Sequence, residues 1–479
     1  MKKLNELFDC NYDILIESIE EDSRVIKNNY LFFCIIGVTT DGHKYVDQAI
    51  ENGAVAIVAS KKIEASVPVI MVDDTSKAII HTLSKFYNNV DKKIKLIGIT
   101  GTDGKTSSST MIYQIINYIE KTCGLIGSNG IKSTNFNKEL NLTTPIAIEY
   151  FNAFFTFYNS GCKYVVMEVA SEALLGKRVC ELEYDIAIFT NLTPEHLNNH
   201  KTMENYRDNK LKLFKMVKKD GISIINNDDD YSDYFKSNAN GKIITYGIDN
   251  TSDVMAKNII IAEKKLLFDI KGYFGDVKIE CPLSGKFNVY NLLTAIITTH
   301  YLGFDINLIK EAIRYLEPIE GRMISIDYCQ PFKVIVDYAH TANGLKNLLE
   351  FMKVITKGKI ITLTGSAGGR DKEKRPAMGR VVCSLSDYVI FTSDDLRWED
   401  PNDIIDDMVS EIKNTYYNYT RVIDRPNAIR KALTMANKDD TVVVAGRGVD
   451  SYQPIGDKMI YCNDIEEVMK YFEGIDIKC

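Results

Sequence analysis

The residues best suited to chemistry in this chain lie in a glycine-rich loop near position 100. Residues 97–106 read I-G-I-T-G-T-D-G-K-T, between a short apolar run and a helical pattern. Glycines let the N–H groups of such a loop turn toward phosphate oxygens, and the following helix adds its N-terminal dipole. Lys105 is expected to reach the β- and γ-phosphates of a nucleotide, and Thr106 to offer its hydroxyl to Mg²⁺. The general pattern G-x-x-x-x-G-K needs a glycine at Ile99, so this shorter variant indicates a nucleotide without naming a reaction.

Three further side chains could carry metal or proton chemistry: Glu168, His196 and Lys210. Glu168 ends an apolar run, where a buried carboxylate without a partner is costly, so a functional role is favoured. His196 taken alone fits a core histidine equally well. Lys210 taken alone fits a solvated helix lysine, because unmodified lysines are usually exposed.

The bulk composition limits the possible functions. The chain has 479 residues, of which 45% are hydrophobic and 26% charged, and at about 150 residues per domain it should form about three domains. Its net charge of −7 gives no electrostatic reason to expect nucleic-acid binding. No apolar run resembles a signal peptide or approaches the ~18 residues of a membrane span. We therefore expect a cytoplasmic protein, a monomer, without nucleic-acid or membrane partners.

The elements that must position these side chains fall into three blocks of the α/β class. Residues 1–90 have the pattern of a small α/β domain, with strands expected at 30–36 and 54–59 and helices at 45–52 and 76–87. Residues 91–318 alternate strands and helices, as in a parallel sheet of the P-loop ATPase type. Residues 319–479 repeat that alternation and indicate a C-terminal Rossmann-like domain.

The expected elements of the two larger blocks are as follows. The central block should have strands at 95–100, 162–169, 185–190 and 222–226 and helices at 107–120 and 289–301. Between 254 and 279 the pattern changes to adjacent alternating strands, which indicates an added antiparallel piece. The third block should have strands at 334–338, 360–364, 388–392 and 441–445.

Motifs over nearly the whole chain resemble, in family order, those of the Mur ligases and their folylpolyglutamate synthetase relatives. The matching segments are G-T-D-G-K-T at 101–106, V-M-E-V-A-S at 166–171, T-N-L-T-P-E-H-L at 190–197, Y-R-D-N-K at 206–210, F-N-V-Y-N at 287–291, G-R-M at 321–323 and D-Y-A-H-T at 337–341. The run G-G-R-D-K at 368–372, with K-R-P at 374–376, is typical of the MurE branch. The segments D-S-R, L-F-F and D-G-H near the N-terminus resemble the UDP-sugar domain of the MurE and MurF branches.

This resemblance implies an ATP-dependent amide ligase of peptidoglycan precursor synthesis. ATP would phosphorylate a carboxylate of UDP-MurNAc-L-Ala-D-Glu, and the amine of a diamino acid, meso-diaminopimelate, would attack the acyl phosphate. The three blocks would bind the UDP-sugar, ATP and the amino acid in that order. Mg²⁺ would assist, and Lys210 would carry a carbamate derived from CO₂, which turns a cation into an oxygen ligand.

The resemblance also assigns the site residues. The expected catalytic residues are Lys105, Glu168, His196 and Lys210, and the expected metal ligands are Thr106, Glu168, His196 and Lys210. The nucleotide would contact Gly101, Thr102, Asp103, Gly104, Lys105, Thr106, Asn288, Asn291, Arg322, Asp337 and His340. The UDP substrate would contact Ser23, Arg24, Thr143, Thr144, Ser171 and Arg178, and the amino acid would contact Asp394, Asp395, Arg397, Gly446 and Asp450.

The chain departs from the family pattern mainly where the amino acid would bind. The usual D-N-P-R is D-D-L-R at 394–397, the usual G-K-G-H-E is G-R-G-V-D at 446–450, and the usual S-S-H is A-S-E at 170–172. Two alternatives stay open: the same chemistry with L-lysine or an unusual amino acid, and a nucleotide-binding homologue without catalysis. Retained Arg397 argues against lysine, which lacks a second carboxylate. Retained Lys105 and Lys210 argue against lost catalysis, and a folylpolyglutamate synthetase would have no use for the N-terminal block.

Overall fold

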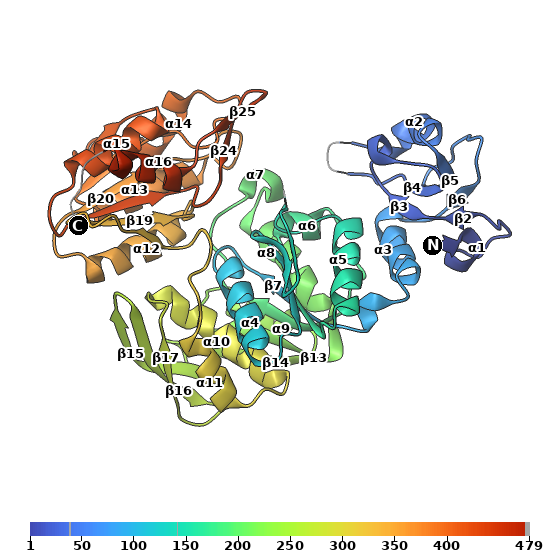
Figure 1. The fold of residues 1–479 in the computed structure, drawn as a ribbon, viewed down its shortest axis with the longest axis horizontal. Coiled ribbons are helices and arrows are strands. Elements are labelled where there is room, and N and C mark those ends of the chain that lie inside the picture. The colour runs from blue at the N-terminus through green and yellow to red at the C-terminus, as the bar shows by residue number, and fades with distance from the viewer. Residues whose placement is uncertain (38–39, 141, 475–479) are drawn as a thin grey trace.

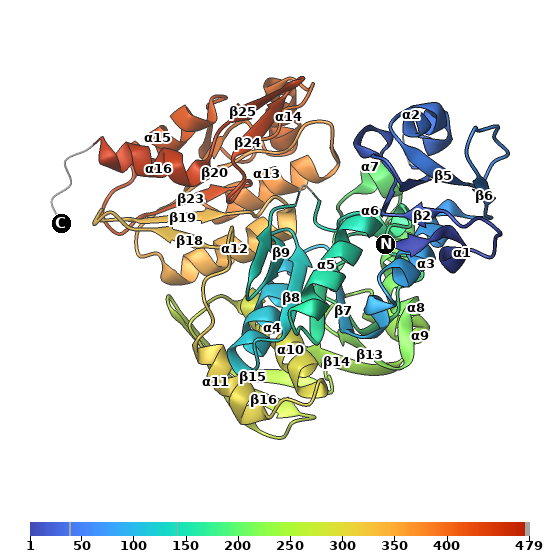
Figure 2. The same cartoon turned by 45° about the vertical axis from the view of Figure 1, so that its right-hand side comes forward.

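The protein folds into three lobes, each built on its own sheet (Figure 1). The computed structural model describes residues 1–37, 40–140 and 142–474. In Figure 1 the N-terminal lobe lies at the upper right, the C-terminal lobe at the upper left, and the central lobe between and below them. Figure 2 shows the same arrangement turned by 45° about the vertical axis. The predicted α/β class with three sheet-based parts is confirmed, whereas the limits 1–90, 91–318 and 319–479 stay predictions.

The N-terminal lobe is a parallel sheet in the order β3-β4-β5-β6. Its elements are β1 (Lys2–Lys3), α1 (Leu4–Leu7), β2 (Leu15–Ile16), β3 (Ser18–Glu20), η1 (Ser23–Val25), β4 (Tyr30–Phe33), η2 (Gly42–Tyr45), α2 (Val46–Glu51), β5 (Ala54–Ala59), β6 (Val69–Met71), α3 (Thr75–Phe86) and η3 (Val90–Lys92). The strand predicted at 30–36 ends at Phe33, because the Ile35 N–H donates to the Phe33 carbonyl at 3.0 Å and turns the chain.

The central lobe holds a mixed sheet of 11 strands in the order β10-β9-β8-β11-β7-β12-β13-β14-β15-β16-β17. Its inner strands run parallel, and its two ends are antiparallel. The strands are β7 (Lys95–Thr100), β8 (Cys123–Gly127), β9 (Gly130–Ser133), β10 (Phe136–Lys138), β11 (Tyr164–Glu168), β12 (Tyr184–Phe189), β13 (Val217–Asn226), β14 (Lys242–Gly247), β15 (Val254–Ala262), β16 (Lys265–Gly272) and β17 (Val277–Cys281). The antiparallel piece predicted at 254–279 is confirmed as β15 to β17.

Helices cover both faces of the central sheet. They are α4 (Lys105–Ile119), α5 (Ala147–Asn159), α6 (Ser171–Leu175), α7 (Leu197–His200), α8 (Met203–Lys215), α9 (Ser232–Asn238), α10 (Lys286–Tyr301) and α11 (Ile306–Arg314). The apolar sides of α4, α10 and α11 share one core, and α5 and α8 share the opposite core with the N-terminal lobe. Helix α4 begins two residues earlier than predicted, because Gly104 at φ +85° forms its N-cap.

The C-terminal lobe has a sheet in the order β18-β19-β23-β20-β21-β22, parallel except for β18 at its edge. Its elements are β18 (Ile324–Ile326), β19 (Lys333–Asp337), α12 (Ala342–Ile355), β20 (Ile360–Thr364), α13 (Lys374–Leu385), β21 (Tyr388–Phe391), α14 (Pro401–Val409), β22 (Tyr419–Arg421), α15 (Arg425–Met435), β23 (Thr441–Ala445), β24 (Tyr452–Ile455), β25 (Lys458–Tyr461) and α16 (Asp464–Glu473). Helices α12 to α14 pack on one face and α15 and α16 on the other. This doubly covered parallel sheet confirms the Rossmann-like prediction.

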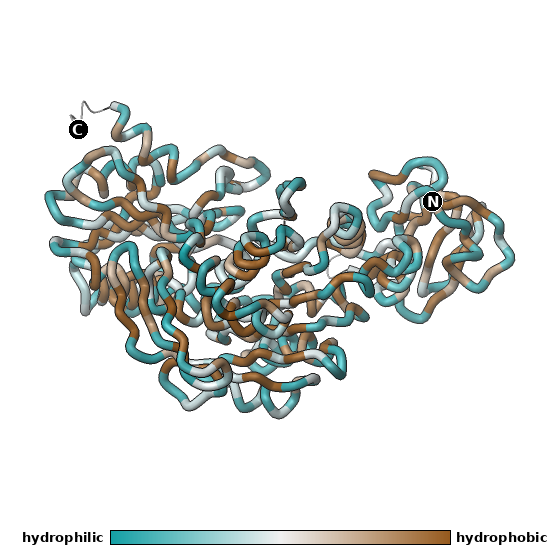
Figure 3. Tube along the Cα trace, turned by 60° about the horizontal axis from the view of Figure 1, so that its bottom comes forward, coloured by the Kyte–Doolittle hydropathy of each residue, from teal (hydrophilic) through white to brown (hydrophobic). Residues whose placement is uncertain are grey.

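The hydropathy of the chain follows this layering. The buried apolar residues lie in the strands and in the helix sides that pack on them, and Figure 3 shows apolar stretches alternating with polar ones along the trace. Among the described residues, no helix combines the length and apolar character needed to cross a membrane.

Candidate active site

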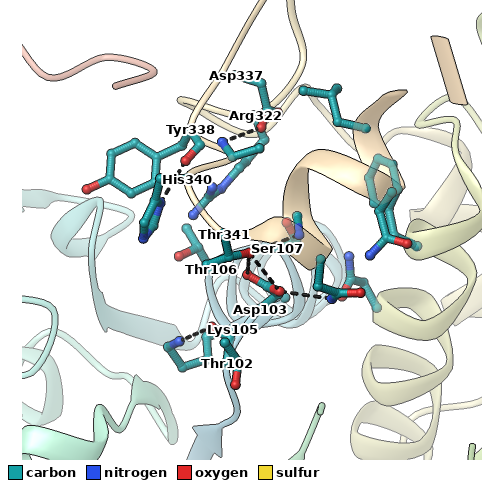
Figure 4. A pocket seen from close by; sticks show the side chains of 18 of the residues that line it. Thr102, Asp103, Lys105, Thr106, Ser107, Arg322, Asp337, Tyr338, His340 and Thr341 are labelled. Atoms are coloured by element: carbon teal, nitrogen blue, oxygen red, sulfur yellow. Dashed lines mark hydrogen bonds between the residues drawn. The ribbon is translucent and has the colours of Figure 1, made fainter. Parts of the chain in front are cut away.

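A cavity of about 1390 Å³ lies where the glycine-rich loop of the central lobe faces the C-terminal lobe. Figure 4 shows side chains from both sides reaching into it. The predicted site residues on its lining are Thr102, Asp103, Gly104, Lys105, Thr106, Thr143, Thr144, Arg178, His196, Asn288, Asn291, Arg322, Asp337, His340, Asp394, Asp395, Arg397, Gly446 and Asp450. The structure therefore brings residues from the central and C-terminal blocks to one place.

The carboxyl end of β7 turns sharply into α4 at two glycines. A side chain at Gly101 would overlap the Thr190 hydroxyl, so this position needs glycine. Gly104 has a φ of +85°, a conformation in which glycine carries no steric penalty. Asn191 fixes the loop between them, because its side-chain oxygen accepts from the Asp103 N–H at 2.9 Å and its nitrogen donates to the Asp103 carbonyl at 3.1 Å. These contacts fix the path of the loop into the N-terminus of α4, the end of a helix that favours phosphate.

A hydroxyl and a carboxylate lie side by side next to this loop. The Thr106 hydroxyl donates to Oε2 of Glu168 at 3.0 Å, and the Ser128 N–H donates to Oε1 at 3.0 Å. Glu168 is 1% exposed. Burial raises the pKa of Glu168, and the nearby charge of Lys105 opposes that shift. Two adjacent oxygen donors of this kind suit Mg²⁺.

Lys210 lies inside the protein, not on a solvated helix face. Its side chain is 1% exposed, and Nζ donates to the Gly101 carbonyl at 2.8 Å. The ammonium lies 4.6 Å from the centre of the Tyr206 ring. Burial, reinforced by the charge of Lys105, lowers the pKa of Lys210 well below its ordinary value. The uncharged amine is therefore favoured directly beneath the phosphate loop.

His196 stands on the cavity wall against a carboxylate that the sequence did not assign to the site. Its Nδ1 lies 2.7 Å from Oε1 of Glu172. Burial would raise the pKa of Glu172, but the hydrogen bond and charge of His196 outweigh burial and hold that pKa below its ordinary range. The only sequence signal for Glu172 is its departure from the family pattern S-S-H.

Arg322, Asp337 and His340 line the cavity from the C-terminal lobe (Figure 4). Asp337, at the end of β19, is buried and accepts from the N–H groups of Met323 and Ala339, both at 2.7 Å. The Arg322 guanidinium lies 4.9 Å from the centre of the Tyr338 ring. Burial raises the pKa of Asp337, and the charge of Arg322 opposes it.

Two contacts join the lobes around the loop. Asp103 accepts from the Thr341 hydroxyl at 3.2 Å and from the Asn343 amide at 3.0 Å. Lys374 donates to Oε1 of Glu195 at 3.0 Å, and both side chains are less than a tenth exposed. The sequence did not predict these bridges, because their partners are far apart in the chain.

Asn288 and Asn291 tie α10 to the start of α4. Asn291 donates to the Asn288 side-chain oxygen at 3.1 Å and accepts from the Ser108 hydroxyl at 3.2 Å. Asn288 donates to the Ser284 carbonyl at 2.7 Å. Both asparagines also line the cavity, so they are placed to contact a nucleotide as well as to join the helices.

The predicted amino-acid site lies at the carboxyl ends of β21 and β23. Arg447 is 1% exposed and forms ion pairs with Asp395 and, at 3.5 Å, with Asp394. Arg397 adopts a left-handed backbone with φ +54°. Burial and the neighbouring charge of Arg370 lower the pKa of Arg397. The wall therefore carries guanidinium groups next to carboxylates.

The predicted UDP-substrate residues fall into two places. Arg178 donates to the Thr144 carbonyl at 2.5 Å, and the Thr143 hydroxyl lies 3.0 Å from that of Ser128. Ser171 is buried behind this wall. The other two residues, Ser23 and Arg24, lie on η1 of the N-terminal lobe and are not part of the cavity lining.

Comparisons with known proteins identify the family. Residues 15–87, 99–299 and 321–448 match the Mur ligase catalytic domain, the Mur ligase middle domain and the Mur ligase glutamate ligase domain. The UDP-N-acetylmuramoyl-L-alanyl-D-glutamate–2,6-diaminopimelate ligase of Bacillus licheniformis is 41% identical over 457 residues, which cover 94% of this chain and 93% of that protein. The chain belongs to the Mur ligase family. The ligase of the same name from Clostridium tetani is 40% identical and covers 99% of each chain.

Solved Mur ligases have the same fold as this one. A UDP-N-acetylmuramoyl-L-alanyl-D-glutamate–2,6-diaminopimelate ligase structure matches with a TM-score of 0.69 at 27% identity, over 99% of both chains. MurF from Acinetobacter baumannii matches with a TM-score of 0.68 at 17% identity, over 90% of both chains. The Mur ligases are ligases that form carbon–nitrogen bonds, and this chain is one of them.

The residues of this Mur ligase fit Mg²⁺ at one position directly. Thr106 and Glu168 supply oxygen donors beside the phosphate loop, and Mg²⁺ commonly takes one or two carboxylates together with substrate phosphates. Of the other two predicted ligands, His196 lines the cavity and Lys210 does not, and an ammonium cannot ligate a cation whereas a carbamate can. Among the described residues, no three His, Cys, Asp or Glu side chains gather into a metal site of their own.

Proposed function

We propose that this Mur ligase joins meso-diaminopimelate to UDP-MurNAc-L-Ala-D-Glu, with ATP consumed through an acyl-phosphate intermediate. The observation that carries the proposal is the acceptor wall, where two guanidinium groups that form no ion pair with any described residue, those of Arg370 and Arg397, adjoin carboxylates in the same cavity as the phosphate loop. The names of the relatives at about 40% identity point to the same substrates.

The acceptor wall suits an amino acid that is charged at both ends. Among the described residues, Arg397 and Arg370 form no ion pair with a carboxylate, and both line the cavity. Guanidinium groups bind carboxylates bidentately, so they favour an acceptor with a distal carboxylate. Asp450 lies on the same wall and suits the distal ammonium, whereas Asp395 already pairs with Arg447. Diaminopimelate offers two carboxylates and a distal ammonium, whereas L-lysine has only its α-carboxylate and would leave one guanidinium group unpaired.

The reaction would be carried mainly by positioning and charge neutralisation. The loop from Gly101 to Gly104 binds the phosphates of ATP, and Lys105 contacts the β- and γ-phosphates. The substrate carboxylate attacks the γ-phosphorus, and the bond to the β–γ bridging oxygen breaks to release ADP. The neutral acceptor amine then attacks the acyl carbon, the bond from that carbon to the phosphate oxygen breaks, and phosphate leaves with the proton that the amine gives up. The bridges between the lobes keep water away from the acyl phosphate.

Mg²⁺ would be held by Thr106 and Glu168, and at a second position by His196 and a carbamylated Lys210. When bound, it would neutralise the charge that the phosphates and the attacking carboxylate bring together. The carbamate is supported by the burial of Lys210 and by its lowered pKa, since CO₂ reacts with the uncharged amine. Within the described structure, Lys210 forms no ion pair with a carboxylate, although the charges of Glu172, Asp103 and Glu195 oppose the lowering of its pKa.

The remaining parts of the proposal concern the UDP end and the setting. We assign UDP-sugar binding to residues 1–90, with Ser23 and Arg24, and assign ATP and amino-acid binding to residues 91–318 and 319–479. Thr143, Thr144, Ser171 and Arg178 would contact the muramoyl part. We place the activity in the cytoplasm, in a monomer, where the UDP-linked precursor and ATP meet.

An omission experiment tests this function. Purified protein with Mg²⁺ should release phosphate only when ATP, UDP-MurNAc-L-Ala-D-Glu and meso-diaminopimelate are all present, and the product should have the mass of the tripeptide precursor. Phosphate release that does not depend on either co-substrate, or its absence from the complete mixture, would overturn the proposal.

A further inference from the structure

Glu172 and His196 approach each other from the two strands that flank the phosphate loop. Strands β11 and β12 both pair with β7, whose carboxyl end forms that loop. Glu172 follows β11 on α6, and His196 follows β12 at the start of α7. The 2.7 Å contact between Oε1 of Glu172 and Nδ1 of His196 therefore joins the segments that follow β11 and β12. Both side chains line the cavity.

Both partners are held in place. His196 has a φ of +59°, a conformation that costs energy for a residue with a side chain and that persists only when its surroundings enforce it. The second oxygen of Glu172, Oε2, accepts from the Ser171 hydroxyl at 3.2 Å. Ser171 in turn lies 3.0 Å from Nε2 of the buried His200. Glu172 is thus anchored from behind and is not a mobile surface carboxylate.

This contact determines which nitrogen of His196 is available. A neutral imidazole has one N–H donor and one acceptor nitrogen. A carboxylate at Nδ1 requires the proton there, which leaves the electron pair of Nε2 free. In the described structure no hydrogen bond is made to Nε2 of His196. Carboxylates commonly orient metal-binding histidines in this way.

We propose that Glu172 is a positioning residue that fixes His196 in the Nδ1–H tautomer and so presents Nε2 to the cation and phosphates of the reaction. Glu172 lies at one of the positions where this chain departs from the S-S-H pattern of the family. This proposal rests on the proposed ligase function only for the identity of the group that binds to Nε2 of His196. The tautomer itself is a property of the substrate-free protein.

The first test is the tautomer of His196 in full-length protein labelled with ¹⁵N-histidine, without nucleotide or metal. Long-range ¹H–¹⁵N spectra, with the signal assigned from its loss in His196→Gln, should give the Nδ1–H form in the wild type. Glu172→Ala should shift His196 toward the Nε2–H form. Glu172→Gln should keep the Nδ1–H form, because its amide oxygen still accepts.

The second test is the Mg²⁺ concentration that gives half-maximal phosphate release. It should rise at least about tenfold in Glu172→Ala, as for other second-layer carboxylates, and should change less than about threefold in Glu172→Gln. The matched control is Glu181→Ala, which removes a surface carboxylate lying 3.5 Å from His81. It should change neither measurement.

The outcomes separate the two proposals. An unchanged His196 tautomer in Glu172→Ala, or an unchanged Mg²⁺ requirement, overturns the role of Glu172. If Glu172→Ala does not fold, loss of the Nδ1–H form in Glu172→Gln overturns it and retention supports it. A wild-type protein that releases no phosphate refutes the ligase proposal, while the spectra still test the pair.

Discussion

Single side chains in this protein show how burial changes chemistry. Lys210, Glu168 and Arg397 are each charged residue types that the fold places next to the cavity, partly or wholly out of water. For Lys210, burial favours the neutral amine and so permits reaction with CO₂. Arg397 forms no ion pair with a described carboxylate, so its guanidinium can bind a carboxylate of the substrate.

The modification of Lys210 can be observed directly. Protein equilibrated with ¹³C-bicarbonate should give one carbamate signal in ¹³C spectra, and this signal should be missing from Lys210→Ala. The kcat of the variant should fall at least about 100-fold, because it lacks a proposed ligand of the Mg²⁺ that stabilises charge in the transition state. The control is Lys212→Ala, which removes an exposed lysine of the same helix α8. This variant should keep the carbamate signal. A fully active wild type without a carbamate signal would contradict this assignment.

The role of Arg397 can be tested through acceptor preference. Arg397→Ala should lower kcat/KM for meso-diaminopimelate about 30- to 1000-fold, since one charged partner of about 2–4 kcal/mol is lost. The value for L-lysine, which lacks the second carboxylate, should change less than about threefold. Steady-state kinetics with both acceptors measure this. Equal losses for both would mean that Arg397 supports the fold and does not select the acceptor.

At the scale of elements, the chain's patterns predicted the phosphate loop, the positions of several main strands along the chain and the Rossmann-like lobe. They could not predict β8, which reads C-G-L-I-G, because glycines in a strand remove the side-chain pattern that identifies it. For the loops after β20 and β21, the sequence offered only the motif G-G-R-D-K at 368–372 and the altered motif D-D-L-R at 394–397, and neither predicts a loop conformation. Their positions depend on Arg375, whose side chain is 0% exposed and which bonds Glu399 and Asp407.

The Arg375–Glu399 pair should make these loops sensitive to acid. The hydrogen bonds of Arg375 hold the pKa of Glu399 well below its ordinary range. A depressed folded-state pKa stabilises the protein above the unfolded pKa of about 4.3, and this contribution is lost as pH falls below it. Glu399→Gln should therefore cost about 3 kcal/mol at pH 7, and the difference from wild type should shrink below about pH 4.

Urea unfolding followed by far-ultraviolet circular dichroism measures this difference, because Trp398, the single tryptophan, is 79% exposed in the folded protein. Glu411→Gln removes an ion pair with Arg380 in which both side chains are about half exposed, and it should cost less than about 1 kcal/mol at any pH. A Glu399→Gln difference that stays constant from pH 7 to pH 3 would show that the pair is not the cause.

At the scale of the whole molecule, the site is complete only where the central and C-terminal lobes meet. The sequence named many of the residues that line this cavity, because each lies in a local motif, although Ser23 and Arg24 lie outside the lining. It could not predict Glu195–Lys374 or Asp103–Thr341, because these contacts join positions far apart in the chain and depend on how the lobes close. The role of Glu172 could not be predicted for the same reason, because its partner His196 lies after a different strand, at the start of α7.

Closure should depend on the buried pair of Lys374 and Glu195. Lys374→Ala leaves Glu195 buried without its counter-charge, which favours separation of the lobes. We expect a larger radius of gyration in X-ray solution scattering and a kcat at least about tenfold lower. Lys372→Ala is the control, since Lys372 is exposed and pairs with Glu399 of its own lobe. Unchanged scattering and kcat in Lys374→Ala would contradict the role of this pair in closure.

The measurement that tests the central claim most directly is a competition between acceptors. Wild-type protein would receive ATP, Mg²⁺, UDP-MurNAc-L-Ala-D-Glu and an equimolar mixture of meso-diaminopimelate, L-lysine and other amino acids, and the products would be identified by mass. The arrangement of Arg397, Arg370, Asp395 and Asp450 predicts that the diaminopimelate tripeptide accounts for nearly all of the product. A predominant lysine product, another tripeptide, or no product from any acceptor would contradict it.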